Sequence, residues 1–396
     1  MKIVYVLTTG KGGLPHYAAE LANAVSKLVE EVTVIKPAIT TADTMFSSKI
    51  NIINAFNWTG LSIADVYKRG MKQILTKEVL GMLISHKHIK KYLNEIQPDI
   101  IHFSTDLFLS GISFVSLGQL HARYPVIVTC HGLPHNKKLL NTSNIKNFYD
   151  ICINIGSFLS LHVLKKIDGI IVHTKNDKNL LVNKDIDSRK IFVIPHGVYS
   201  IFKKICNEYF HEEKETILFF GNITPDKDIN AVIEAIMIVK KQIPNIKLII
   251  AGNGKIPNTC KMIIGRYKLN IEIYNYFIPN EKVCEFFSRA SVVVIPEKRS
   301  RGGHSGVLTI AYSFGKPVIA TNVGDFPILV RDSGCGFVVS PKDPKALAEA
   351  IVRILEDDRL RKKMSRNALK KAEELSWDKI AKRHIKVYEE VLEGDR

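Results

Sequence analysis

A glycine-rich segment at residues 299–306 combines residue types that could bind an anion. It reads R-S-R-G-G-H-S-G and follows an apolar run. Gly303 and Gly306 flank His304 and Ser305 just before an amphipathic stretch. The glycines remove side-chain bulk, while the Ser305 hydroxyl and the first-turn N–H groups of a helix can donate to phosphate oxygens. This segment therefore predicts a phosphate-type site at a strand-to-helix junction.

Two further glycine turns follow apolar runs. Gly12 and Gly13 close T-T-G-K-G-G before a helical pattern, and Gly252 and Gly254 lie in I-A-G-N-G. Glycine lets the backbone approach a ligand, and a following helix offers unpaired N–H groups. The spacing G-x-G-G, and Lys36 instead of an acid after the second apolar run, argue against an NAD site. For each single glycine, a tight turn without a ligand is the alternative.

Two titratable side chains lie at predicted strand ends. His131 follows the run P-V-I-V-T-C, where it could form hydrogen bonds to a ligand or take part in proton transfer. Lys227 follows the run that ends at Gly221 and precedes a helix, where its ammonium group could neutralise a phosphate. The alternatives are a histidine that bonds loop carbonyls and a solvent-facing lysine. His196, at the predicted hinge between domains, is interpreted as structural.

The metal-ligating residue types form no pattern that predicts a metal site. His86 and His88 lie two apart on a predicted helix over 71–96, so their side chains point away from each other. Asp185 and Asp187 lie in a polar stretch that is typical of a solvated turn. The six cysteines are scattered without a C-x-x-C pair, which argues against zinc and a disulfide framework and suits a reducing cytosol. We expect no metal and no other cofactor.

Alternating apolar runs and helical patterns must position these residues. Continuous β-branched runs are typical of parallel strands, because helices cover both faces of such a sheet. Two series of such strands predict two doubly wound, Rossmann-like α/β domains that face each other across a cleft, with ligands beyond the carboxyl ends of the strands. We expect an N-terminal domain over 1–197, a C-terminal domain over 198–375 and a last helix over 376–396. The predicted strands span residues 2–8, 31–36, 99–104, 125–130, 169–174 and 190–195 in the first domain, and 216–221, 245–252, 270–274, 290–296 and 316–321 in the second.

Length and composition bound the class of protein. The 396 residues suit two domains, and 46% hydrophobic with 24% charged residues describe a globular protein. The net charge of +17 is spread over both halves, which suits anionic ligands or surfaces. There is no basic stripe with interleaved aromatic residues of the kind that predicts nucleic-acid binding. No apolar run predicts a signal peptide or a membrane span. We therefore expect a cytoplasmic protein that meets a membrane, if at all, peripherally on its inner face.

Taken together, several motifs resemble a known family. G-G-L-P-H-Y-A-A-E-L-A, T-C-H-G, G-N-I-T-P-D-K, I-A-G-N-G and S-G-V-L-T-I-A-Y-S-F-G-K-P-V-I-A-T-N-V-G follow one another along the chain. In this order they resemble the retaining nucleotide-sugar glycosyltransferases of family 4, also described as glycosyl transferases group 1, which have the GT-B fold. The resemblance spans nearly the whole chain.

The resemblance implies sugar transfer from a nucleoside diphosphate with retained anomeric configuration and without a metal. It implies that His131 contacts the transferring sugar, that Lys227 neutralises the leaving phosphate, and that the last helix, from about Trp377, crosses back to the first domain. The residues implied to border the donor are Gly12, Gly13, Gly252, Gly254, Gly303, His304, Ser305 and Gly306.

Two departures from the family pattern concern charged residues. Asn222 stands where the family usually has an arginine, and Gly302 and Ile310 stand where it usually has two glutamates. Some relatives instead carry a Ser-Gly pair, which Ser305 and Gly306 resemble. Our hypothesis is that Arg299 or Arg301 replaces the lost positive charge near the phosphate, and the alternative is a pair of solvated loop arginines.

Residues 66–96 mix lysines with a broad apolar face. One interpretation is an interfacial element that brings the enzyme to a glycan or lipid-linked acceptor on an anionic membrane, and the other is a pair of core-packed helices with a basic side. Two other functions compete with glycosyl transfer. One is a non-catalytic sugar-nucleotide-binding subunit of an enzyme pair, and the other is a sugar-nucleotide epimerase, which the lack of paired carboxylates in the motif loops disfavours.

Overall fold

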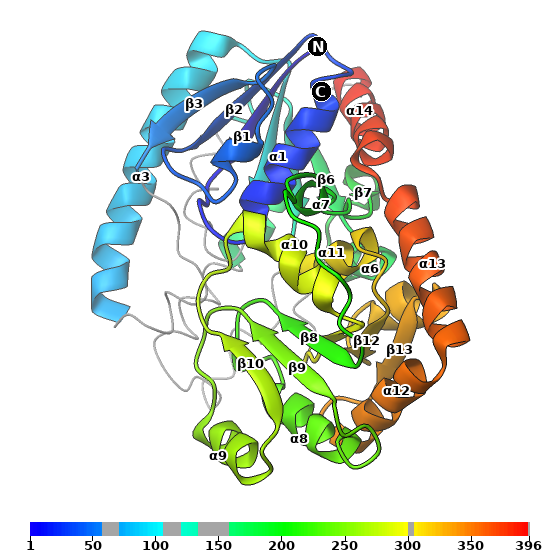
Figure 1. Cartoon of the computed structure of the whole chain (residues 1–396). Coiled ribbons are helices and arrows are strands. Elements are labelled where there is room, and N and C mark those ends of the chain that lie inside the picture. The colour runs from blue at the N-terminus through cyan, green and yellow to red at the C-terminus, as the bar shows by residue number, and fades with distance from the viewer. Residues whose placement is uncertain (58–70, 106–119, 134–157, 300–304, 395–396) are drawn as a thin grey trace. The chain divides into compact units, whose positions relative to one another are not determined.

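The chain folds into two compact units, each built around one parallel sheet (Figure 1). Unit 1 comprises Met1–Gly197 and Trp377–Arg396, and unit 2 comprises Val198–Ser300 and Ser305–Ser376. The structure is a computed structural model that describes residues 1–57, 71–105, 120–133, 158–299 and 305–394.

Among the described residues of unit 1, seven parallel strands form a sheet in the order β3-β2-β1-β4-β5-β6-β7. Strands β1, β2, β5 and β6 are buried and mostly apolar, as strands covered on both faces require. The order reverses between β1 and β4, which is the topological switch point of a doubly wound sheet. The strands are β1 (Lys2–Leu7), β2 (Glu31–Pro37), β3 (Asn51–Phe56), β4 (Ile100–Thr105), β5 (Val126–Cys130), β6 (Gly169–Val172) and β7 (Ile191–Val193).

In the described part of unit 2, six parallel strands form a second sheet in the order β10-β9-β8-β11-β12-β13, so its switch point lies between β8 and β11. The strands are β8 (Thr216–Phe220), β9 (Lys247–Ala251), β10 (Asn270–Tyr274), β11 (Val292–Ile295), β12 (Val318–Thr321) and β13 (Gly336–Val339).

Helices connect the strands and cover the sheets (Figure 1). Side chains cap several of them: Thr174, Asp228 and Asp343 each accept a hydrogen bond from a backbone N–H of the first turn of α6, α8 and α12. The α-helices are α1 (Leu14–Val25), α3 (Met71–Ile96), α6 (Lys175–Val182), α7 (Ile201–Lys204), α8 (Ile229–Val239), α9 (Asn258–Arg266), α10 (Asn280–Arg289), α11 (Gly306–Ser313), α12 (Pro344–Glu356), α13 (Asp358–Glu374) and α14 (Trp377–Glu393). Shorter turns are the 3₁₀ segments η1 (Asp43–Met45) and η3 (Ser188–Lys190) and the π-helical η4 (Pro327–Asp332).

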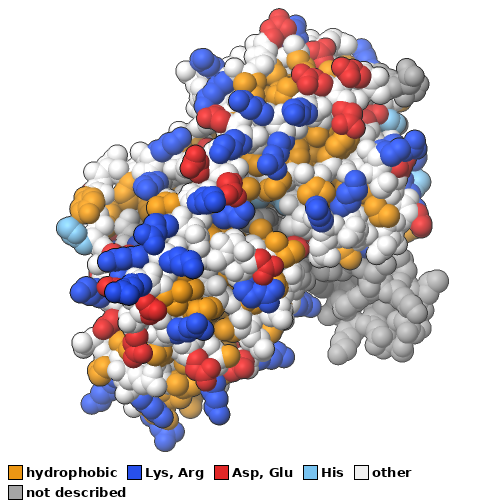
Figure 2. Space-filling view, turned by 90° about the vertical axis from the view of Figure 1, so that its right-hand side faces the viewer, with side chains coloured by type: hydrophobic (Ala, Val, Ile, Leu, Met, Phe, Trp, Pro, Cys, Tyr) orange, Lys and Arg blue, Asp and Glu red, His pale blue; other side chains and the backbone are white. Residues whose placement is uncertain are grey.

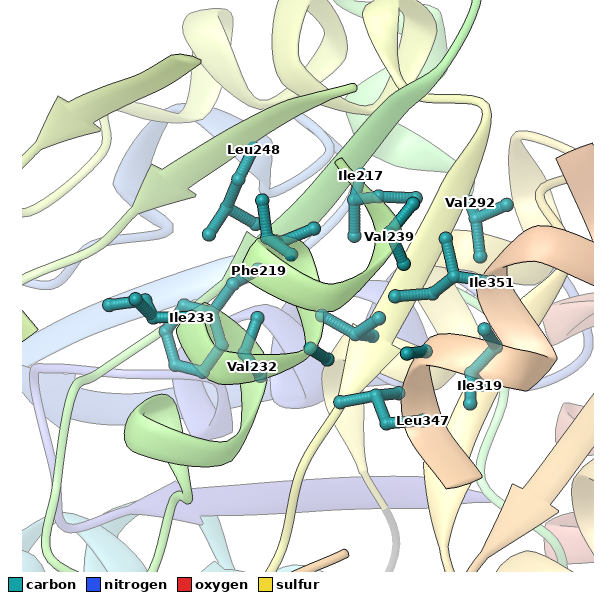
Figure 3. Packing of buried hydrophobic residues seen from close by; sticks show 14 of the residues in the cluster. Ile217, Phe219, Val232, Ile233, Val239, Leu248, Val292, Ile319, Leu347 and Ile351 are labelled. Carbon is teal, nitrogen blue, oxygen red and sulfur yellow. The ribbon is translucent and has the colours of Figure 1, made fainter. Parts of the chain in front are cut away.

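Apolar packing of α8 and α12 against the sheet makes the core of unit 2 (Figure 3). Phe219 of β8 lies beside Val232 and Ile233 of α8, while Ile351 of α12 faces β11 and β12. Each such side chain is at most 1% exposed, and full burial of one contributes about 1.5–3 kcal/mol. This packing holds the β8 and β11 strand ends in fixed register.

The prediction of two doubly wound α/β sheets is confirmed, as is every predicted strand. Strands β3 and β13 were not predicted from the sequence. Strand β3 is an edge strand in which Asn51 and Asn54 flank two isoleucines, and β13 is a short G-F-V-V run. In unit 2 the structure also joins Cys206 to Cys284 in a disulfide with a Cα–Cα distance of 5.8 Å. The cysteine spacing, which argued against a disulfide framework, did not predict this single pair, because the fold brings together residues that are 78 apart.

Charged side chains are mixed over the surface. On the face shown in Figure 2, Lys and Arg side chains lie among acidic and apolar ones and do not gather in one stripe. No helix within the described ranges is long and apolar enough to cross a membrane.

Candidate functional site

The predicted site residues lie at the carboxyl-terminal edges of the two sheets. Parallel strands bring all their carboxyl ends to one edge, where loops from neighbouring strands meet. In unit 1 the turn after β1 and the residue after β5 lie at such an edge. In unit 2 the loops after β8, β9 and β11 do so.

In unit 1, the turn after β1 is built around Gly12 and Gly13. Gly12 has a positive φ of 81°, and its carbonyl oxygen lies 3.2 Å from Thr41 Oγ1 and 3.0 Å from His16 Nδ1. A Cβ added to Gly12 would meet nothing within 4 Å, so this turn presents open space. Gly13 is the N-cap of α1 and provides no side-chain cap. The N–H groups of the first turn of α1 thus begin at a turn that lacks side-chain bulk.

His131 directly follows β5 and is partly buried. Its Nε2 lies 3.3 Å from Ser104 Oγ, and its Nδ1 lies 3.2 Å from His173 Nε2. The ring of Tyr17, from α1, packs edge-on against it with centroids 4.4 Å apart. Its imidazole is therefore bonded through both nitrogens and held from one side.

His131 belongs to a group of histidines that we name the strand-end histidine cluster. Ring centroids of His131 and His173 are 5.0 Å apart, and those of His173 and His196 are 5.1 Å apart. Consecutive strands position the cluster, with His384 added from α14. Its members are His102 on β4, His131 after β5, His173 after β6, His196 after β7 and His384.

Burial keeps four of these histidines, His102, His131, His173 and His384, uncharged near neutral pH. Burial first, and then repulsion by His173, His196 and other members of the cluster, lowers the pKa of His131 well below its ordinary value. Burial lowers the pKa of His173 to about 4 and that of His384 to about 4. The pKa of His102 is also lowered well below the ordinary value, again mainly by burial. These four rings are therefore polar but neutral.

A buried hydroxyl network joins α14 to the strand that precedes His131. Tyr5 and Tyr388 have hydroxyl oxygens 2.9 Å apart, and Tyr388 Oη lies 2.7 Å from His102 Nδ1. His102 Nε2 in turn lies 2.7 Å from Thr129 Oγ1, on β5. Burial raises the pKa of both tyrosines, so the network carries no charge at neutral pH. Helix α14 therefore helps to fix the end of β5.

In unit 2, the loops after β8 and β11 are joined by three ion pairs, which we name the charged ladder. Lys227 Nζ lies 2.5 Å from Glu297 Oε1, and both side chains are less than a fifth exposed. Two further ion pairs flank this one, at 2.6 Å between Arg299 and Asp226 and 3.7 Å between Lys298 and Asp228.

Backbone hydrogen bonds hold the charged ladder in place. The N–H of Lys298 donates to the carbonyl of Asp226, and that of Asp228 donates to Pro296, both at 2.7 Å. The ladder lies at the β8/β11 switch point, where doubly wound sheets bind ligands.

The glycines after β9 permit close backbone packing. Gly252 and Gly254 have φ values of 149° and 155°, and a Cβ on either would overlap a carbonyl oxygen, that of Gly221 or that of Ile223. The β8 loop is therefore pressed against the β9 loop. Asn222 is exposed at this point.

Ser305 is the N-cap of α11, and its side chain makes no capping hydrogen bond. A Cβ on Gly306 would lie 3.2 Å from the Tyr199 ring, so glycine at this position allows the ring to pack closely on the helix start. Ile310 is buried in α11. Arg301, Gly302, Gly303 and His304 lie outside the described residues.

The structure thus places the described candidates on two edges. On unit 1 it places Gly12, Gly13 and His131, and on unit 2 it places the remaining described candidates, with Lys227 half-buried in an ion pair. Sequence reasoning missed Glu297 and Asp226, which face Lys227 and Arg299. It also missed the cluster, although the motifs T-C-H-G, I-V-H-T and I-P-H-G each put a histidine at the end of an apolar run.

The two sheets with their covering helices define a GT-B fold. Sucrose-phosphate synthase from Thermosynechococcus elongatus has this arrangement, with a TM-score of 0.71 and 18% identity over 99% of each chain. Anabaena HepE, in complex with UDP, gives a TM-score of 0.68 and 15% identity over 98% of this chain and 100% of that one. At these identities the similarity shows the fold alone.

Sequence comparison gives the family. Residues 11–200 match the model described as Glycosyltransferase Family 4, and residues 202–371 match the one described as Glycosyl transferases group 1. An uncharacterized glycosyltransferase of Methanocaldococcus jannaschii is 30% identical over 67% of this chain and 69% of its own length. The chain therefore belongs to the glycosyltransferases that combine a Family 4 domain with a group 1 domain. For another relative the match spans 46% of that protein, less than half its length.

Proposed function

We propose that this protein is a retaining glycosyltransferase that transfers a sugar from a nucleoside-diphosphate sugar to a hydroxyl acceptor. The observation that carries the proposal is Lys227, a half-buried ammonium group at the switch point of unit 2, held by one carboxylate beside a glycine-rich loop. Family membership and the UDP complex of Anabaena HepE support a nucleotide-sugar donor. No metal is part of the proposal.

In this proposal unit 2 binds the donor. Lys227 stabilises the negative charge that develops on the diphosphate as the sugar leaves. Because the ammonium group is already held in place, it does not have to reorient during the reaction. Ser305 and the first-turn N–H groups of α11 add hydrogen bonds to the phosphates. No side chain caps this helix start, so these N–H groups can donate to a ligand. Gly252, Gly254 and Asn222 border the nucleotide.

Unit 1 acts on the sugar. Gly12 and Gly13 allow the donor to approach the start of α1, because no side chain fills the space over the turn. His131 forms a hydrogen bond to the transferring sugar and remains neutral, since burial lowers its pKa. Orientation of the sugar, rather than charge, is the contribution of this edge.

The missing glutamates change how the sugar and ribose hydroxyls are recognised. Ser305 and Gly306 take the place of the usual acidic contacts, in this proposal. Arg299 is a candidate for the charge lost at Asn222, and its pairing with Asp226 means that only part of its charge is available to a phosphate. Alanine variants of Arg299 and Arg301 test this compensation: unchanged donor affinity in both contradicts it.

The acceptor is proposed to be a glycan or a lipid-linked hydroxyl at an anionic membrane surface. The lysines between residues 66 and 96 motivate the membrane part of this proposal. Co-sedimentation with vesicles, with and without anionic lipid at low salt, tests it. Equal recovery in the supernatant for both vesicle types contradicts a membrane role.

A donor panel tests the function itself. The purified chain is incubated with UDP-, GDP- and ADP-sugars, and binding and slow donor hydrolysis are both measured. We expect one donor to bind and to be hydrolysed with release of the nucleoside diphosphate and a sugar that keeps its anomeric configuration. Binding without hydrolysis or transfer identifies a non-catalytic subunit, and conversion to an epimeric sugar nucleotide identifies an epimerase.

A further inference from the structure

The contacts of His131 continue through a second histidine to a backbone carbonyl. His173 Nδ1 lies 3.0 Å from the carbonyl oxygen of Ile194, and His173 Nε2 lies 3.2 Å from His131 Nδ1. His131 Nε2 then lies 3.3 Å from Ser104 Oγ. Both rings and their partners belong to unit 1.

The direction of each hydrogen bond follows from the carbonyl at one end. A carbonyl oxygen only accepts, so His173 must carry its proton on Nδ1. A neutral imidazole has one N–H, so the Nε2 of His173 is an acceptor. Burial keeps His173 neutral by lowering its pKa to about 4. The nitrogen facing it, Nδ1 of His131, is therefore the donor.

The same argument fixes the second ring. His131 is neutral, because burial and the neighbouring histidines lower its pKa well below the ordinary value. With its proton on Nδ1, its Nε2 carries a lone pair. Ser104 donates its hydroxyl hydrogen to that nitrogen, as the 3.3 Å distance allows.

We propose that His173 is a positioning residue that holds His131 in the Nδ1–H tautomer. The Nε2 lone pair, which accepts from Ser104 in the free protein, then accepts from a sugar hydroxyl that replaces Ser104, and His131 does not supply a proton. The assignment of the tautomer stands on unit 1 alone, whereas the role toward a sugar rests on the proposed function. A histidine so arranged orients a hydroxyl-bearing ligand, and the proton for a leaving group has to come from elsewhere.

Nitrogen NMR of the full chain tests the tautomer directly. Histidine labelled with ¹⁵N is incorporated, and long-range ¹H–¹⁵N correlation distinguishes a protonated from a bare ring nitrogen at pH 7. The His131→Leu variant identifies the signals of that residue. We expect His131 to be neutral with its proton on Nδ1, and His173 to be neutral with its proton also on Nδ1.

Two variants at His173 separate positioning from structural support. His173→Leu removes the acceptor, so the His131 signals should shift to a mixture of tautomers or to Nε2–H. His173→Gln offers a side-chain oxygen to His131 Nδ1, so it should restore the wild-type tautomer. His384→Gln is the matched control: it changes another buried histidine of the cluster, whose Nδ1 faces the Ile380 carbonyl, and should leave the His131 tautomer unchanged.

The kinetic readout links the tautomer to turnover. With the donor found in the panel, His173→Leu should lower kcat about tenfold or more with little change in KM for the donor, and His173→Gln should recover most of kcat. An Nε2–H tautomer of His131 in the wild type overturns the inference, as does a wild-type spectrum in His173→Leu. If the tautomer is as expected and no nucleotide sugar reacts, the proposed function fails while the role of His173 in holding His131 stands.

Discussion

The carboxyl-terminal edges of the two sheets share a topology but differ in charge. The edge of unit 1 carries the strand-end histidine cluster, whose rings bond to hydroxyls, carbonyls and one another. Burial lowers the pKa values of His102, His131, His173 and His384. The edge of unit 2 carries the charged ladder, in which three cations pair with three carboxylates. The histidine cluster of unit 1 is thus polar with neutral rings, whereas the charged ladder of unit 2 is ionic.

This difference separates two tasks of sugar transfer. A diphosphate leaving group needs fixed positive charge, which Lys227 provides in a partly buried setting. A sugar presents hydroxyl groups, for which neutral acceptors and donors of fixed direction are suited. The following changes test whether the separation holds.

Loss of the Lys227 ammonium should have the largest effect. We expect Lys227→Ala to lower kcat/KM for the donor by about 10²- to 10³-fold, the usual result of removing one fixed donor from a developing charge. Steady-state kinetics measure the change. Lys298→Ala is the matched control, because Lys298 lies in the same ladder and pairs with Asp228 at a longer distance. A similar loss in both variants would mean that the ladder acts only as a whole.

A methyl group at Gly252 should be costly for stability. The new Cβ would overlap the Gly221 carbonyl, and the backbone has a φ of 149° that L residues rarely adopt. We expect Gly252→Ala to lower the free energy of unfolding by about 3 kcal/mol or more. Gly265→Ala, on α9 with no atom within 4 Å of the new Cβ, should be neutral or stabilising by about 0.5 kcal/mol. Thermal melts that rank the two variants the other way contradict this packing.

Acid should destabilise unit 1 more than unit 2. His86, His173 and His384 each have a folded pKa of about 4 against an ordinary 6.5, so the unfolded chain binds more protons between these values. Stability is therefore retained above pH 6.5 and lost as the pH falls toward 4, by up to about 1 kcal/mol per pH unit for each histidine. Hydrogen exchange measured at several pH values should show β4–β6 amides losing protection before those of β8 and β11. Equal loss in both sheets contradicts the neutral cluster.

The smallest effect is expected for the carboxylate beside Lys227. Glu297→Gln leaves Lys227 with a neutral neighbour, so a bound diphosphate no longer competes with an ion pair. We expect nucleoside-diphosphate affinity to rise about two- to fivefold, the size of a partly screened pair. Isothermal titration measures the change, and weaker binding in this variant would show that Glu297 holds Lys227 in its binding position.

Apolar runs along the sequence were sufficient to predict most strands of the fold. Only part of the candidate site could be predicted from such local patterns. Continuous apolar runs predict buried parallel strands. Strand β3 lacks such a run, because a strand at the sheet edge is partly exposed and can contain polar residues such as Asn51 and Asn54. His131 and Lys227 were predicted from their places after such runs. Glu297 could not be, because its relation to Lys227 depends on a pairing across 70 residues. The disulfide of Cys206 and Cys284 has the same origin in tertiary contact.

Binding of a nucleoside diphosphate without its sugar tests the separation of tasks most directly. UDP, GDP and ADP are titrated into the wild type, Lys227→Ala and His131→Leu, and the dissociation constants are compared. The account predicts that Lys227→Ala loses most of the affinity for the preferred nucleoside diphosphate, while His131→Leu binds it as the wild type does and loses turnover. Equal weakening of nucleoside-diphosphate binding in both variants, or none in Lys227→Ala, would contradict the account.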